Sequence, residues 1–320
     1  RNHARIIAAS GRANLVGIVD PFEANGTAAT SQYGGEWFPA AEEALKRADA
    51  VVVAASTEYH YDIAREILDA GVPVLIEKPI CPSLEQTEEI LAIAERSGVP
   101  VQCGFLERYN AGVLAAQHLI EEPIYVRAER HSPYWARIKT GVAWDVLVHD
   151  ADLISRMYGS QSPDKVNAEL GYFHPESVEG AEDVIDMTLR FPGGGIASAS
   201  ASRVGQRKVR RLTIQSLDSM VEVDLLLRSV TKYRHANIES TDGRAGFKQM
   251  TEMEVPEVSG AEPLAAQFDH FVDLVEGRVD AEFCPRTGSS LQRSRSGNAT
   301  LLDAPHRDEL RLDGGVDSSY

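Results

Sequence analysis

Cysteine, long apolar runs and positive charge are all scarce in this sequence. The three cysteines, Cys81, Cys103 and Cys284, show neither metal-site spacing nor a disulfide pattern, so we expect a reducing, cytoplasmic compartment. No apolar run is long enough to span a membrane. Because 48 acidic residues outnumber 32 basic ones, the chain has no basic field to neutralise nucleic-acid phosphates. We therefore expect neither a membrane nor a nucleic acid as a partner.

The remaining composition is that of a globular protein with room for two cores. The 320 residues are 43% hydrophobic and 25% charged. Strand-like and helix-like segments alternate in the first third of the chain, which predicts a Rossmann-type α/β fold with a doubly wound parallel sheet. Ligands bind such sheets beyond the carboxyl ends of the strands. The expected strands are 13–21, 49–56, 73–80 and 99–105, and the expected helices are 40–48, 62–71 and 84–98.

The pattern changes after residue 120. Residues 142–158 are expected to form one long helix, and the consecutive strand-like segments that follow predict a large, mostly antiparallel open sheet in an α+β domain. We expect a Rossmann domain over 1–108, an α+β substrate and oligomerisation domain over 109–284, and an atypical tail over 285–320. The tail lacks hydrophobic periodicity, so we expect it to be disordered or to come from a shifted reading frame.

A Glu-Lys pair stands where the apolar strand "PVLI" ends. Pro79 prevents an ordinary central strand from continuing, and it suggests a constrained backbone, with a cis bond as one option. The pair Glu77 and Lys78 is either a solvated strand terminus or part of a site at the carboxyl edge of the sheet. Cys81 follows closely, and we interpret it as an inert small residue rather than a reactive thiol.

Asp20 ends the strand "LVGIVD". In a dinucleotide-binding unit, an acid at that place accepts hydrogen bonds from the adenosine ribose and repels a 2′-phosphate, which favours NAD over NADP. The alternative is an ordinary turn residue.

Three polar residues share one face of the expected helix 142–158. Asp145, His149 and Asp152 are four and three residues apart, which is helical spacing. An acid one turn from a histidine can fix its tautomer and raise its basicity, as a general base requires. A surface Asp–His pair and a divalent metal site are the alternatives.

Taken together and in order, these motifs resemble one family. "VVVAASTEYHYDIAREILDAGVPVLIEKPI", "GFLERYN" and "WDVLVHDADL" are similar to the core of the Gfo/Idh/MocA family of NAD(P)-dependent sugar and inositol oxidoreductases. Its members open with a strand and G-x-G-x-x-G, and "RNHARI" resembles the helix that follows. The resemblance therefore implies that this strand and its diphosphate loop are missing from the sequence.

The resemblance assigns roles by position. It implies a catalytic trio of Lys78, Asp145 and His149 without a metal. It implies cofactor contacts from Asp20 on the ribose, Glu77 on the nicotinamide side, and a turn in which Ser56 and Thr57 depart from the usual Thr-Pro-Asn. The full set of implied cofactor residues is Asp20, Ala54, Ser56, Thr57, His60 and Glu77.

The stretch "ERHSPYWARIKTGVAWDVLVHDADL" is most similar to family members that act on nucleotide-activated sugars. The substrate contacts that the resemblance implies are Arg108, Arg130, Tyr134, Arg137 and Asp152.

The function expected from the resemblance is hydride transfer between NAD and a hydroxyl carbon of a sugar, inositol or nucleotide sugar. A small carbohydrate would be the partner, and the open sheet of the second domain would form a homo-oligomer. A redox-neutral glycosidase or lyase that retains NAD would use the same trio. A catalytically silent NAD-binding regulator is the non-enzyme alternative.

Overall fold

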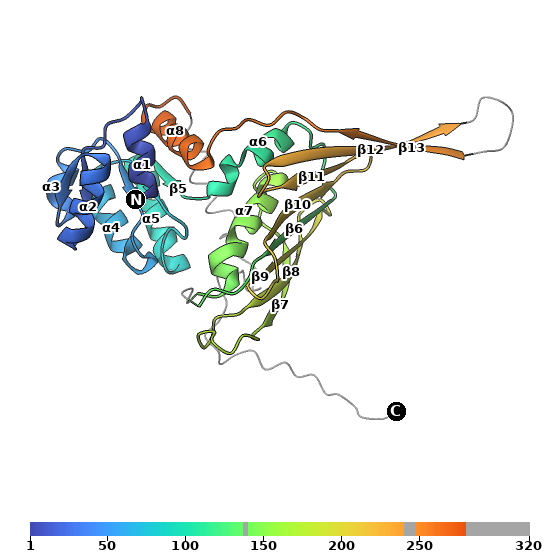
Figure 1. Cartoon of the computed structure of the whole chain (residues 1–320), viewed down its shortest axis with the longest axis horizontal. Coiled ribbons are helices and arrows are strands. Elements are labelled where there is room, and N and C mark those ends of the chain that lie inside the picture. The colour runs from blue at the N-terminus through green and yellow to red at the C-terminus, as the bar shows by residue number, and fades with distance from the viewer. Residues whose placement is uncertain (137–139, 240–246, 280–320) are drawn as a thin grey trace.

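A computed structural model describes residues 1–136, 140–239 and 247–279. Short parallel strands with surrounding helices form one part of the molecule, and a large sheet forms the other (Figure 1). This confirms the predicted combination of a Rossmann-type α/β unit with a mostly antiparallel α+β unit. The expected tail over 285–320 lies outside the described residues, as do Arg137 and Cys284.

The first part, called here the parallel-strand part, runs from α1 to β5. Its strands β4 and β5 are fully buried, because helices cover such sheets on both faces, whereas β1, β2 and β3 are partly exposed. β1 pairs with β2, and β4 lies between β3 and β5, all in parallel. The elements are α1 (Asn2–Ala9), β1 (Gly17–Val19), α2 (Glu23–Tyr33), β2 (Glu36–Phe38), α3 (Ala41–Leu45), β3 (Val51–Val53), η1 (Thr57–Tyr59), α4 (His60–Asp69), β4 (Val74–Ile76), α5 (Leu84–Ser97) and β5 (Val101–Cys103).

Helix α5 begins and ends at the residues that its sequence indicates. Ser83 is the N-cap, and its Oγ accepts a hydrogen bond from the backbone N–H of Gln86 at 3.2 Å. Gly98 ends the helix with φ +68°, a left-handed conformation that costs glycine little.

The second part, called here the large-sheet part, contains an eight-stranded sheet of order β13-β12-β11-β10-β6-β9-β8-β7. Every neighbouring pair is antiparallel except β6 and β9. The elements are η2 (Leu106–Tyr109), α6 (Ala111–Gln117), β6 (Tyr125–His131), the π-helical turn η3 (Ala143–Leu147), α7 (Val148–Met157), β7 (Lys165–Gly171), β8 (Val184–Arg190), β9 (Ile196–Ser202), β10 (Val209–Gln215), β11 (Met220–Asp224), β12 (Ser229–Glu239) and β13 (Phe247–Glu254).

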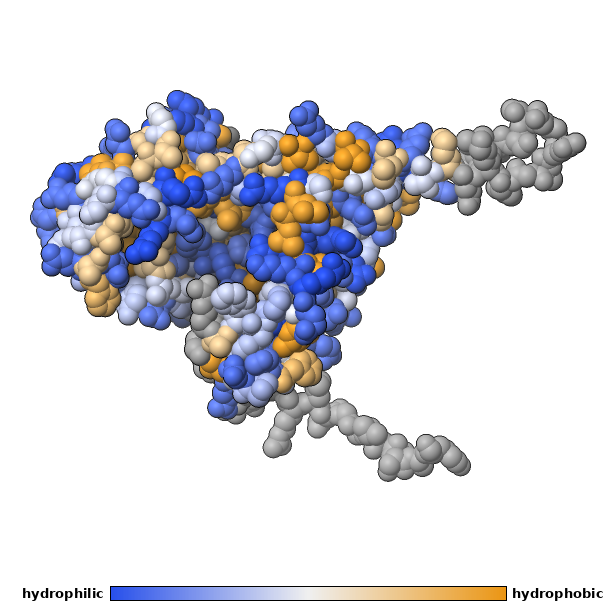
Figure 2. All heavy atoms as spheres, viewed as in Figure 1, coloured by the Kyte–Doolittle hydropathy of each residue, from blue (hydrophilic) through white to orange (hydrophobic). Residues whose placement is uncertain are grey.

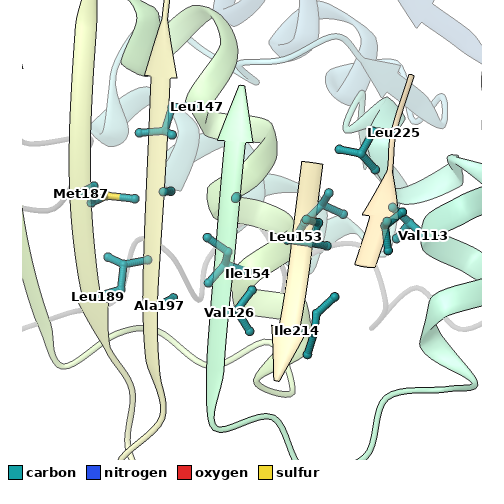
Figure 3. Packing of buried hydrophobic residues seen from close by; sticks show 14 of the residues in the cluster. Val113, Val126, Leu147, Leu153, Ile154, Met187, Leu189, Ala197, Ile214 and Leu225 are labelled. Atoms are coloured by element: carbon teal, nitrogen blue, oxygen red, sulfur yellow. The ribbon is translucent and has the colours of Figure 1, made fainter. Parts of the chain in front are cut away.

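One face of this sheet is packed and the other is open. Along β8, β9 and β10 buried apolar residues alternate with more exposed ones, as a sheet covered on one face requires. Leu153 and Ile154 of α7 lie over the strands among Val126, Met187 and Ile214 (Figure 3). The buried face therefore fixes where α7 sits.

The helix expected over 142–158 is present without a break from 142 to 157, but its first turn is π-helical. Residues Ala143–Leu147 form a π-helical turn, and α7 begins only at Val148. Glu182 holds the start of this turn, since its Oε1 accepts a hydrogen bond from the backbone N–H of Ala143 at 2.7 Å. A π turn pairs residues five apart instead of four, so the side chains before and after it do not follow α-helical spacing.

The last described helix packs against the parallel-strand part. Helix α8 (Pro263–Val275) places Phe271 and Leu274 on Leu75 of β4, and Phe268 beside Ile6 of α1. Figure 1 shows α8 next to α1, far from the sheet strands that precede it in sequence. In the described residues, no helix is long and apolar enough to cross a membrane.

The packing of α7 can be tested by truncation of a core side chain. Leu153 is fully buried, whereas Leu217 is 86% exposed. We expect Leu153→Ala to lower the free energy of unfolding by roughly 2–5 kcal/mol, because it removes buried apolar surface and leaves a cavity. The matched Leu217→Ala should change it by less than about 0.5 kcal/mol. Urea denaturation measures both, and equal effects would contradict the described packing.

Candidate functional site

Lys78 joins the two parts of the molecule. It follows β4 at the carboxyl edge of the parallel strands, and its peptide bond to Pro79 is cis, one of the options that the sequence suggested. Its Nζ donates a hydrogen bond to the backbone carbonyl of Asp145 and lies 3.4 Å from the Asp145 Oδ1. The ammonium group of the first part is therefore held against the π turn of the second.

Glu77 turns toward a different element. Its Oε1 lies 2.7 Å from Nε2 of His3 in α1, and its side chain passes close to Gly104. A Cβ at Gly104 would come within 2.7 Å of the Glu77 Oε2, so glycine is needed for this approach. The acid and the ammonium of the pair thus face α1 and the π turn, respectively.

His149 lies in the first turn of α7 in a half-buried position. Its ring stands edge-on to Phe105, with 6.2 Å between ring centroids. Burial is the main reason that the pKa of His149 lies well below its ordinary value. Nearby positive charges lower this pKa further, and they come from Arg130, Lys78 and Arg210. The imidazole is therefore neutral at neutral pH and can accept a proton.

The expected contact between Asp145 and His149 is not formed. Within the described residues the buried Nδ1 of His149 has no hydrogen-bond partner, and the Asp145 carboxylate faces Lys78 instead. The reason is the π turn, which removes the α-helical register that the spacing of four residues assumed. In this geometry Asp145 positions Lys78 and does not fix the tautomer of His149.

Two expected substrate contacts, Arg108 and Asp152, bind each other. Arg108 donates from Nε to Asp152 Oδ2 at 2.7 Å and from a terminal nitrogen to Oδ1 at 2.5 Å. Both side chains are buried. The pair fastens η2 to α7, which is a different role from the one that the resemblance implied.

Arg130 is also used inside the protein. It donates two hydrogen bonds to the Asp150 carboxylate, at 2.7 and 2.8 Å, and a third to Glu107 at 2.9 Å. With a side chain only 5% exposed, it fixes β6 to α7 rather than reaching toward solvent.

Sequence reasoning missed Arg210. It is the cross-strand partner of Arg130, and its terminal nitrogen lies 3.4 Å from Glu107 Oε1. A signal was present, because alternation in "VRRLTIQ" places residue 210 on the same face as Leu212 and Ile214, where a charge is unusual.

Asp20 lies at the end of β1 with half of its carboxylate engaged. Its Oδ1 accepts a hydrogen bond from the backbone N–H of Phe22 at 2.8 Å, and Oδ2 has no partner among the described residues. The free oxygen fits a ribose hydroxyl.

The turn after β3 leaves Ala54 and Ser56 exposed and half-buries Thr57, so their surfaces can still meet a cofactor. His60 differs from this expectation. It is buried, with Nδ1 2.8 Å from the Pro79 carbonyl oxygen and Nε2 3.0 Å from that of Ala55. With both ring nitrogens beside backbone carbonyls, His60 braces the turn against the Lys78–Pro79 segment.

Two further predictions concern single side chains. The ring of Tyr134 stacks on the ring of His174, with 3.5 Å between the ring centroids. The sequence did not indicate His174 as a neighbour of this expected substrate contact. Cys81 is buried, and burial raises the pKa of its thiol to about 12, as expected for an inert residue.

No group of three His, Cys, Asp or Glu side chains among residues 1–136, 140–239 and 247–279 is placed to hold a metal.

The site therefore combines a neutral imidazole and an ammonium group with two acids, Glu77 beside Lys78 and Asp20 at the end of β1. Figure 2 shows that the surface is hollowed between the two parts, where hydrophilic residues gather. A dinucleotide would find the Asp20 oxygen at its ribose end and Glu77 with Lys78 at its nicotinamide end, so the residues present fit such a cofactor at both ends.

Comparison with known proteins gives consistent results. Residues 1–105 match the model of an oxidoreductase family with an NAD-binding Rossmann fold, GFO_IDH_MocA, and residues 115–217 match the GFO/IDH/MocA C-terminal domain. UDP-N-acetylglucosamine 3-dehydrogenase of Acidithiobacillus ferrooxidans is 25% identical over 277 residues, which is 86% of this chain and 85% of that protein. Inositol 2-dehydrogenase of Rhizobium meliloti is 26% identical over 63% of this chain and 64% of its own length.

Solved structures share the fold. The UDP-N-acetylglucosamine 3-dehydrogenase GnnA of A. ferrooxidans superposes with a TM-score of 0.78 at 24% identity, covering 91% of both chains. A levoglucosan dehydrogenase in complex with NADH and levoglucosan gives 0.70 at 15% identity, covering 86% of this chain and 87% of that one. The chain belongs to the Gfo/Idh/MocA family, and it is an NAD(P)-dependent dehydrogenase that acts on CH–OH groups.

Proposed function

We propose that the chain oxidises a hydroxyl carbon of a sugar, inositol or nucleotide sugar and uses NAD rather than NADP. The observation that carries this proposal is the meeting of Lys78 with the π turn, one helical turn before the neutral imidazole of His149. An ammonium donor held against the turn that precedes an uncharged proton acceptor supplies the two groups that alcohol oxidation requires.

His149 is the proton acceptor in this proposal. Its pKa is held below the ordinary value by burial and by neighbouring cations, so the ring is unprotonated before the reaction. Lys78 donates a hydrogen bond to the reacting oxygen and stabilises the negative charge that develops there. A bound nicotinamide cofactor would supply the hydride acceptor for the carbinol carbon.

Asp145 and its backbone carbonyl hold the Lys78 ammonium in place. Two of the three N–H bonds of the ammonium group are used in these contacts with Asp145, so the third can donate to the substrate. Asp145 is therefore a positioning residue that acts through Lys78. Glu77, held by His3 on the other side of the strand end, lies where the nicotinamide end of the cofactor is expected.

The nucleotide-sugar option draws support from similarity over most of the chain to a UDP-N-acetylglucosamine 3-dehydrogenase. The inositol option draws support from the shorter matches to inositol 2-dehydrogenases. A panel of inositols, free sugars and nucleotide sugars with NAD, followed at the absorbance of NADH, distinguishes these substrate classes. A redox-neutral product in place of NADH would sink the dehydrogenase assignment.

The assignment of His149 can be tested by substitution. We expect His149→Asn to lower kcat by roughly 10²- to 10⁴-fold on the best substrate of the panel, because general-base catalysis is removed. The exposed His118, at the end of α6, provides a control, and His118→Asn should leave kcat unchanged. Equal rates for His149→Asn and wild type would exclude His149 as the base.

The cofactor preference can be tested at Asp20. We expect Asp20→Ala to weaken NADH binding by about tenfold or more, because a charge-assisted hydrogen bond to the ribose is lost. Binding of NADPH should improve relative to NADH, since the carboxylate no longer repels a 2′-phosphate. Fluorescence titration with both reduced cofactors measures this, with the exposed Asp49 replaced by Ala as the control. An unchanged NADH to NADPH ratio would argue against the role.

Self-association through the open face of the large sheet is also part of the proposal. Direct cross-strand partners form one mostly apolar row across six strands on that face, from Ile196, 50% exposed, to Met253, 65% exposed. Beyond this row the face carries small hydroxyl residues and charges of both signs, including Arg127 and Glu222. Such a surface can pair with a second copy of itself. The row is Ile196, Tyr125, Gln215, Met220, Tyr233 and Met253.

Sedimentation velocity tests this assembly. We expect the double substitution Ile196→Asp and Met253→Asp to dissociate the oligomer into single chains, because each buries a charge in the proposed contact. Leu227→Asp, at a 78% exposed turn residue away from the row, should leave the sedimentation coefficient unchanged. A wild-type protein that sediments as a single chain at micromolar concentration would refute the interface.

A further inference from the structure

Two arginines lie side by side on the packed face of the large sheet. Arg130 of β6 and Arg210 of β10 are directly opposed in an antiparallel pair, and residues in such pairs have Cβ atoms only about 5 Å apart. Like charges in this arrangement repel each other. A second cation at this place therefore needs negative charge to balance it.

The acceptors nearby are mostly used by Arg130. The Asp150 carboxylate takes two hydrogen bonds from Arg130, and Glu107 Oε1 takes a third at 2.9 Å. Arg210 shares that same Glu107 oxygen at the longer distance of 3.4 Å. The other oxygen of Glu107 accepts from Asn110 at 3.2 Å.

Arg210 consequently keeps most of its donors. A guanidinium group has five N–H bonds, and one long contact to Glu107 is the hydrogen bond that Arg210 makes within the described residues. Its side chain is 41% exposed, in contrast to 5% for Arg130. The unused N–H bonds can therefore reach a ligand.

Arg210 interacts electrostatically with the groups of the proposed active site. Asp145 and Asp150 act on its charge, and its own charge is among those that act on His149. Burial is the main cause that lowers the pKa of Arg210, and the adjacent Arg130 lowers it further, against the opposing effect of the nearby carboxylates.

We propose that Arg210 binds a negatively charged oxygen group of the substrate, a carboxylate or a phosphate, beside Lys78 and His149. The planar guanidinium group matches the paired oxygens of either anion. These oxygens would accept charge-assisted hydrogen bonds from the N–H groups that have no acceptor within the described residues. This inference rests on the proposed function, whose site it extends. It narrows the substrate class from carbohydrates in general to sugar acids, sugar phosphates or nucleotide sugars.

The test compares how tightly the protein binds three forms of one sugar, which are glucose, glucuronate and glucose 1-phosphate. Calorimetric titration of the full chain with NADH present, and again without it, gives dissociation constants that do not depend on turnover. We expect Arg210→Gln to weaken binding of the preferred anionic ligand by about tenfold or more, and to change glucose binding little. Arg210→Lys should restore part of the affinity, since it keeps the charge but not the fork.

The neighbouring residue provides a matched control. Arg211 is exposed and lies on the opposite face of the same strand, so Arg211→Gln removes equal charge without touching the site. It should leave all three affinities unchanged. Urea midpoints for each variant show whether the fold is retained.

The outcomes separate this inference from the proposed function. Preference for glucuronate indicates a carboxylate, and preference for glucose 1-phosphate indicates a phosphate. Wild-type protein that binds neither anion more tightly than glucose would overturn the inference, as would an equal loss for all three ligands in Arg210→Gln. Arg210-dependent anion binding without NADH formation from any substrate would leave the inference standing and reject the dehydrogenase activity instead.

Discussion

The site depends on two buried Arg–Asp pairs that hold α7 from two sides. Asp150 binds Arg130 on the large sheet, and Asp152 binds Arg108 on η2. Residues two apart on a helix point in nearly opposite directions, so the two pairs fix both the rotation and the position of α7. Buried charges of this kind are stable only when both partners are present and well oriented, because removal of one leaves an unpaired charge in a dry environment. His149 comes immediately before this doubly held segment, and its placement follows from it.

The electrostatics of the site follow from the same pairs. Asp150 and Asp152 are occupied by their arginines, so no carboxylate is left to raise the pKa of His149. The third aspartate, Asp145, holds Lys78 and ties the strand end of the parallel-strand part to the large-sheet part. The result is a base kept neutral mainly by burial, with surrounding positive charge lowering its pKa further, next to an ammonium group held by Asp145. Neither part of the molecule supplies this combination alone.

Much of this could be predicted from the sequence, and the failures have physical causes. Hydrophobic periodicity predicted the strands within 13–21, 49–56, 73–80 and 99–105, the helices 40–48, 62–71 and 84–98, and the order of the two folds. The resemblance implied a trio of Lys78, Asp145 and His149, and the structure brings Lys78 to Asp145. The pairing of Asp145 with His149 was wrong because a π turn is invisible to a spacing rule. Arg108, Asp152 and Arg130 were interpreted as substrate contacts because sequence shows that a charge is present but not whether a buried partner already neutralises it.

The π turn has a consequence that concerns the length of the segment rather than the identity of its residues. A π turn amounts to one residue more than an α-helix would use over the same span. Deletion of a single residue in 143–147 would allow a regular α-helix over the same span, so the segment before the turn would keep nearly the same orientation relative to α7. A relative that is one residue shorter here can therefore keep both ends of the segment in place, namely the backbone contact that Glu182 makes at Ala143 and the buried Asp150.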